Sequence, residues 1–93
     1  MSRGAGSRPP LSPREAWLSD GHHVLHFRPT RWDSWAQELE VVTGELLPDQ
    51  PVPLLKRRLE MSREEAIRLW KEKCGQGWRA CEPQWPSSVA LRR

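Results

Sequence analysis

The stretch WLSDGHHVLHF, from Trp17 to Phe27, decides the fold of this chain. At its centre stands Asp20-Gly21, a residue pair that tolerates the positive φ angles of a tight turn, with strand-forming residues on both sides. Side chains alternate between the two faces of a strand. One face of the expected hairpin therefore carries Leu18, Leu25 and Phe27. On the other face Trp17 should lie opposite Val24, so the pattern predicts an antiparallel hairpin with one face against a core.

The segment from Thr30 to Thr43 fits two patterns. Helical spacing joins Trp32, Trp35, Ala36, Leu39 and Val42. Alternate positions join Trp35, Gln37, Leu39 and Val41, and the β-branched residues that follow favour a strand. We expect Pro29 to end the second strand and residues 30–34 to form a helical turn. A strand at 35–43 and a short return strand at 45–47 should follow.

The C-terminal half contains the clearest helix signal. Ser62 and Glu65 have the spacing of a capping box, and glycines at 75 and 77 favour a helix end. Before the helix, three prolines between 48 and 53 predict an extended connector, after which residues 54–61 can either add an edge strand or simply cross the sheet. The sequence thus predicts an α+β fold: an antiparallel sheet of three to four strands (the hairpin at Asp20-Gly21 and further strands at about 35–47), packed by one helix at 63–74.

Tryptophan supplies an unusual share of the apolar surface. The 93 residues include six tryptophans, one phenylalanine and no tyrosine. A domain of this size has a small core, in which each large side chain matters. We expect Trp17, Trp35, Trp70 and Trp78 to lie in the core. Trp32 and Trp85 are the candidates for exposure, because each stands beside loop-forming or charged residues.

The ends of the chain differ in composition from its middle. Residues 1–14 contain arginine, serine, glycine and proline but no acid, which predicts a disordered basic tail. Residues 15–85 are expected to form a single domain, and 86–93 a loose C-terminal tail. The formal charge is +3, and five arginines lie in the tails, so removing them leaves −2 for residues 15–91. This slightly acidic body argues against a basic surface built for phosphates.

No apolar run is long enough to span a membrane, and the N-terminus lacks the apolar core of a secretory signal. We therefore expect a soluble cytoplasmic protein without membrane contact. Cys74 and Cys81 should be reduced thiols.

The chain resembles a family of short uncharacterised cyanobacterial proteins, classified as a domain of unknown function. The resemblance covers roughly Trp17 to Trp85 and rests on the order of its motifs. These are Trp17-Leu18, Asp20-Gly21, Trp32, Trp35, Thr43-Gly44-Glu45-Leu46-Leu47-Pro48, Leu54-Leu55, Ala66-Ile67, Trp70, Gly77-Trp78, Cys81, Pro83 and Trp85. The likeness implies one compact domain. It carries no activity, substrate or cofactor onto any residue.

Candidate metal ligands are present, but their spacing is unfavourable. They are His22, His23, His26, Cys74 and Cys81. Six residues separate the cysteines, where structural zinc sites use two to four, and alternation turns His23 away from the other two histidines. The pattern favours solvent-facing histidines, and cysteines that pack as small apolar groups. We expect no metal and no cofactor.

The sequence contains no motif of a known catalytic class, so we expect a protein that is not an enzyme. Tryptophan is enriched in binding hot spots, which favours a protein-interaction module, with a homodimer or an unknown protein partner. The alternative is a weak nucleic-acid-binding protein that uses its basic tails and the Lys56-Arg57-Arg58 cluster, although such a cluster can equally protect a sheet edge from aggregation. The possible interaction surface is Trp32, Trp85, Lys56, Arg57 and Arg58.

Overall fold

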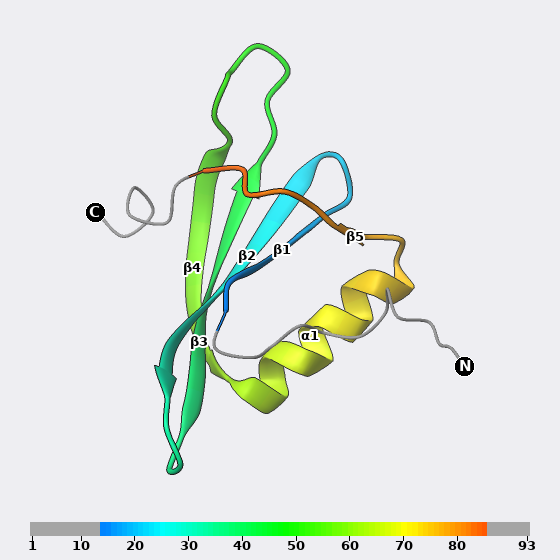
Figure 1. Cartoon of the computed structure of the whole chain (residues 1–93). Coiled ribbons are helices and arrows are strands. Elements are labelled where there is room, and N and C mark those ends of the chain that lie inside the picture. Colours follow the sequence, from blue (N-terminus) through cyan, green and yellow to red (C-terminus); the bar gives the residue numbers. More distant parts are fainter. Residues whose placement is uncertain (1–13, 86–93) are drawn as a thin grey trace.

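The computed structural model describes residues 14–85. The tails predicted at 1–14 and 86–93 therefore lie outside the described residues, apart from Arg14. The elements are β1 (Ala16–Ser19), β2 (His23–Trp32), β3 (Gln37–Glu45), β4 (Leu54–Ser62), α1 (Arg63–Gly75) and β5 (Arg79–Ala80). The strands form one antiparallel sheet in the order β4-β3-β2-β1-β5, and α1 lies across one of its faces (Figure 1). The predicted α+β class is confirmed, with the two-residue β5 as a fifth strand.

The hairpin forms as predicted, but its register is shifted by two residues. Trp17 pairs with His26, and Val24 pairs with Ser19. The cause is a longer turn: the Asp20 carboxylate accepts the backbone N–H groups of His22 at 2.8 Å and His23 at 2.7 Å. Trp17 and Val24 still share a face, because the shift is an even number of residues.

Pro29 does not end the second strand, and no helical turn forms at 30–34. Strand β2 continues to Trp32 through an irregularity in the register between Pro29 and Arg31, which accommodates a residue without a backbone donor. The chain then turns at Asp33, whose carboxylate accepts the amides of Trp35 and Ala36, each at 2.8 Å. The strand expected at 35–43 runs from Gln37 to Glu45, and the return strand expected at 45–47 does not form.

The edge strand and the helix follow their sequence signals closely. Strand β4 pairs with β3 along almost its whole length. Ser62 caps α1 through both bonds of a capping box: its hydroxyl accepts the Glu65 amide at 3.2 Å, and the Glu65 carboxylate accepts the Ser62 amide at 3.0 Å. Gly77 adopts a positive φ of 99° two residues after the helix, where the chain turns back towards β5.

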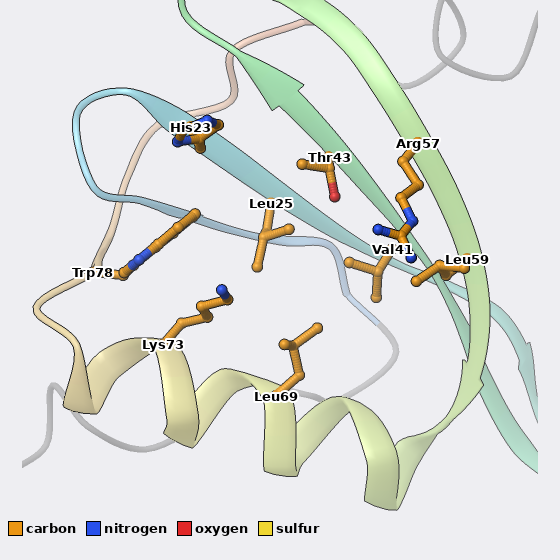
Figure 2. A pocket seen from close by; sticks show the side chains of 9 residues that line it. All are labelled: His23, Leu25, Val41, Thr43, Arg57, Leu59, Leu69, Lys73 and Trp78. Atoms are coloured by element: carbon orange, nitrogen blue, oxygen red, sulfur yellow. The ribbon is translucent and has the colours of Figure 1, made fainter.

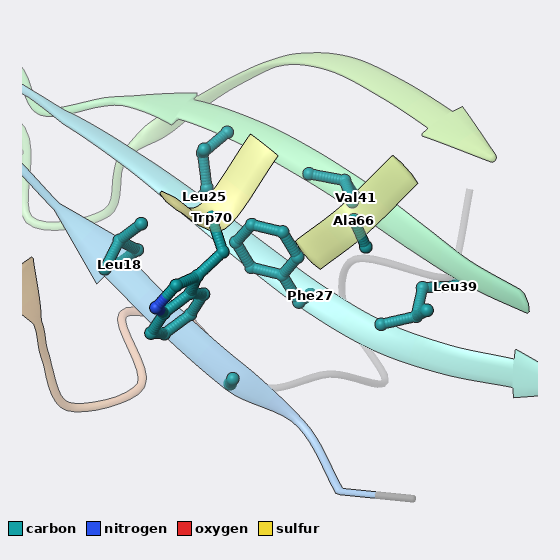
Figure 3. Packing of buried hydrophobic residues seen from close by; sticks show 8 residues of the cluster. Leu18, Leu25, Phe27, Leu39, Val41, Ala66 and Trp70 are labelled. Carbon is teal, nitrogen blue, oxygen red and sulfur yellow. The ribbon is translucent and has the colours of Figure 1, made fainter. Parts of the chain in front are cut away.

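The buried side chains form one cluster on each face of the sheet. The cluster under α1 consists of Ala16, Leu18, Leu25, Phe27, Leu39, Val41, Ala66 and Trp70 (Figure 3). The smaller cluster on the opposite face, called the back face below, consists of Trp17, Val24, Val42 and Trp85. The short segment after β5 therefore covers apolar residues that the helix cannot reach.

Two tryptophans occupy the opposite of their expected environments. Trp35, expected in the core, is 88% exposed, because the Asp33 turn places it at the tip of the β2–β3 hairpin. Trp85, a candidate for exposure, is 3% exposed and packs against Trp17. Trp17 and Trp70 are buried as predicted, while Trp32 and Trp78 are partly buried.

Candidate interaction surfaces

The outer edge of the sheet is strand β4, called the β4 edge below. Its nine residues are exposed except for the partly buried Met61. Three leucines are unusually open for apolar residues: Leu54 is 49%, Leu55 38% and Leu59 44% exposed. A strand paired on one side only presents unpaired backbone donors and acceptors on the other, so the β4 edge can accept a further strand.

The basic cluster Lys56-Arg57-Arg58 is divided by the alternation of the strand. Lys56 pairs with Glu45 at 3.2 Å, and Arg58 pairs with Glu40 at 3.2 Å. Arg57 points to the helix-covered face instead, where it lines a groove. Two of the three positive charges are therefore matched by carboxylates of β3, and the cluster does not present one basic surface.

The groove lies between α1 and the sheet, with a volume of about 370 Å³, and is called the α1 groove below. Its walls come from strands β2, β3 and β4, from the helix and from the residues just after it (Figure 2). The residues that line it are His23, Leu25, Val41, Thr43, Arg57, Leu59, Leu69, Lys73 and Trp78. No sequence motif joins these residues, because they are scattered over more than fifty positions.

All the charged or titratable side chains that line the α1 groove are bases. The Lys73 amine lies 5.0 Å from the centre of the Trp78 ring, and the His23 ring stacks against the same tryptophan with 6.4 Å between ring centres. Within the described part of the chain, Arg57 and Lys73 have no carboxylate partner within ion-pair distance. The groove thus combines apolar walls with two cations that no described acid neutralises.

His26 is fully buried on the back face, although it was expected to face solvent. Its ring stacks on Trp17 at 3.9 Å between ring centres, and its Nε2 lies 2.9 Å from the Glu15 carboxylate. Burial lowers the pKa of His26, and the Glu15 carboxylate opposes this effect only in part. Its Nδ1 has no hydrogen-bond partner among the described residues, so the neutral ring suits the site.

Glu40 is the second buried polar residue of the back face. Its carboxylate lies between Arg58, at 3.2 Å, and Arg28, at 3.6 Å. The contact with Arg28 is an ion pair that is too long for a hydrogen bond. A glutamate in a strand usually faces solvent, so nothing next to Glu40 in the sequence predicts its burial. The available sign is the pair Arg28 and Arg58 on the two neighbouring strands, and it can be recognised only once the pairing register of these strands is known.

Cys74 and Cys81 are free thiols, each partly buried. Burial raises the pKa of both thiols, and Glu82 adds to the effect at Cys81. His22 and His23 are exposed. In the described part of the chain, no three His, Cys, Asp or Glu side chains come together as a metal site would require. Nor does that part contain a helix long and apolar enough to cross a membrane.

The predicted interaction residues do not form one surface. Lys56, Arg57 and Arg58 lie on the β4 edge, whereas Trp85 is buried on the back face. Trp32 is partly buried beneath the guanidinium of Arg63, which lies 6.0 Å from the ring centre. Trp35 is the exposed tryptophan instead, and the Asp33-Ser34 pair before it was the available sign of a tight turn.

A five-stranded antiparallel sheet with one helix, an open edge strand and a groove beneath the helix defines a small α+β domain. Residues 15–85 match the family described as "Protein of unknown function (DUF1651)". The chain belongs to this family. No curated protein and no solved structure is significantly similar to the chain.

Proposed function

We propose that this protein is a non-catalytic protein-interaction module that pairs with a second copy of itself along the β4 edge. The carrying observation is the nine-residue edge strand, which leaves three leucines between 38% and 49% exposed. Natural edge strands are commonly short, bulged or covered, since an open edge invites pairing. A long edge with apolar side chains is therefore better explained as an interface than as an ordinary surface.

The charges along β4 favour self-pairing in one register. In an antiparallel pair centred on Leu59, this residue meets Leu59 of the second copy, and Arg58 lies opposite Glu60 on both sides of the centre. Arg58 and Glu60 both face the back face, because they pair with Val42 and Glu40 of strand β3. In this register residues 56–62 of the two copies pair, with an Arg58–Glu60 ion pair on each side of the Leu59 contact, while Leu54 and Leu55 lie beyond the paired segment. Such complementary charges set the register of an interface more than its strength.

The non-catalytic role is supported by the positions of the buried titratable groups. His26 is stacked on Trp17, and Glu40 is held between two arginines, so each is engaged in packing on the back face. Two matched charges among Lys56, Arg57 and Arg58 also weaken the nucleic-acid alternative. The cytoplasmic location and the cyanobacterial origin remain predictions from the sequence.

The test is the solution mass of the full chain, measured by sedimentation equilibrium up to millimolar concentration. We expect a monomer–dimer equilibrium that Glu60→Lys and Leu59→Lys each shift towards monomer. The first places a lysine opposite Arg58 of the other copy, and the second places a charge at the centre of the pair. The matched control is Glu72→Lys, an exposed site on α1 away from the β4 edge. A wild-type chain that stays monomeric, or a dimer that persists in both β4 variants, would overturn the proposal.

A further inference from the structure

We propose that the α1 groove binds a small amphipathic anion, with an apolar body and a single carboxylate or phosphate group. The groove has about 370 Å³ of space, within the range of small-molecule sites. The groove opens on the face beneath α1, whereas a second strand would add in the plane of the sheet, so the two sites are distinct although both include Arg57 and Leu59 of β4.

The apolar body is accommodated by the walls of the groove. Leu25 and Val41 form the sheet side, and Leu69 faces them from the helix (Figure 2). Leu59, which is 44% exposed, extends the apolar wall onto strand β4. Leu25 and Val41 are already buried, so the apolar surface that a ligand would remove from water belongs mainly to Leu59 and to the partly buried Leu69 and Trp78. Removing such surface from water is the main favourable contribution to binding of an apolar ligand.

The anionic group follows from the charges around those walls. Arg57 on β4 and Lys73 on α1 reach the groove from two elements, and the only other titratable lining residue is His23. None of the lining residues is an acid. Trp78 beneath the Lys73 amine holds that amine at the groove rather than leaving it free to follow solvent (Figure 2). An anion there would satisfy cations that have no described carboxylate partner, and a cation would be repelled.

The charge pattern also distinguishes this ligand from other classes. A polyanion such as a nucleic acid would need matched cations beyond the groove, yet the neighbouring Lys56 and Arg58 already pair with carboxylates. A neutral apolar molecule would leave Arg57 and Lys73 partly desolvated without a partner, which costs free energy. A ligand with one negative group on an apolar body pairs with these two cations and needs no further cations outside the groove.

The test is a titration of the full-length ¹⁵N-labelled chain, followed by the indole N–H signal of Trp78 and the backbone amides of the groove. The probes are octanoate and octyl phosphate, with octylamine and octanol as matched cationic and neutral controls. We expect saturable shifts at Trp78, Leu25 and Leu69 with at least one of the anions, and the stronger binder identifies the head group. The two controls should bind at least several-fold more weakly.

Variants test the assigned cations. Arg57→Gln and Lys73→Gln should each weaken binding of the better anion about tenfold. The control Lys71→Gln, at an exposed site on the same helix, should leave it unchanged, and an unaltered amide spectrum elsewhere verifies the fold of each variant. Equal binding of octylamine or octanol, unchanged affinity in both groove variants, shifts confined to other regions, or no saturable shift at all would overturn the proposal. Repeating the titration on the Glu60→Lys chain, in which pairing along the β4 edge is opposed, separates these results from dimer formation.

Discussion

Replacing Trp85 by alanine should destabilise the domain severely, although this tryptophan lies beyond the last strand. Trp85 is 3% exposed, and its ring lies 4.7 Å from Trp17 and 5.8 Å from His26, both edge to face. Truncating a buried tryptophan to alanine costs about 3 to 5 kcal/mol. Domains have a free energy of unfolding of about 0.05 to 0.15 kcal/mol per residue, roughly 4 to 11 kcal/mol for residues 15–85.

Urea unfolding followed by far-ultraviolet circular dichroism measures this loss. Trp85→Phe should lose less than Trp85→Ala, because the ring retains part of its packing, and it keeps the comparison measurable where the alanine variant is largely unfolded. The control is Trp35→Ala, at a side chain 88% exposed, for which we expect a change of at most about 0.5 kcal/mol. The reasoning is refuted by equal effects at the two tryptophans, or by a loss below about 1 kcal/mol for Trp85→Ala.

Three further changes test other parts of the structure. Burial lowers the pKa of His26 in the folded chain, so the unfolded chain binds more protons at this residue. The free energy of unfolding should therefore fall as the pH drops through about 6.5. His26→Gln should flatten this pH dependence, measured by urea denaturation at several pH values. Ser62→Ala removes the cap of α1 and should lower the urea midpoint by an amount equivalent to about 1 kcal/mol; no change would refute the cap's contribution. Gly44→Ala places a Cβ 2.9 Å from the Trp85 ring and should lower the free energy of unfolding by about 1 to 3 kcal/mol. The loss is measured in the wild-type chain and again in the Trp85→Ala chain, where the clash is absent. An unchanged urea midpoint in the wild-type chain would show that the ring moves aside without loss of stability.

The local signals in the sequence were sufficient for the hairpin and the helix. Asp20-Gly21 and the Ser62 capping box act within a few residues, so their structure depends little on the rest of the chain. The two-residue shift of the hairpin arose from Asp20 bonding two successive amides. The sequence is compatible with this longer turn and equally with a shorter one, so the register could not be predicted from it.

The errors came from features that depend on distant packing. Pro29 remains within β2 because the register irregularity absorbs its missing donor, a solution that requires β3 alongside. Trp85 is buried because Gly44, far away in the sequence, leaves room for its ring. Neither contact is visible in the residues next to Pro29 or Trp85, where the sequence favoured a strand end and an exposed side chain.

The candidate sites were only partly accessible to sequence analysis. Lys56, Arg57 and Arg58 were identified as a cluster, but the pairing of Lys56 and Arg58 with carboxylates depends on the β3–β4 register. The α1 groove forms only where the helix lies over three strands, so its lining residues come together only in the folded chain.

Amide hydrogen exchange along strand β4, recorded as a function of protein concentration, tests the proposed self-pairing most directly. If a second copy adds to the β4 edge in the proposed register, the outward-facing amides between Lys56 and Ser62 gain protection as the concentration rises, while those of α1 do not change. The Glu60→Lys chain should show no such gain. Concentration-independent exchange of the β4 amides in the wild-type chain would contradict the account.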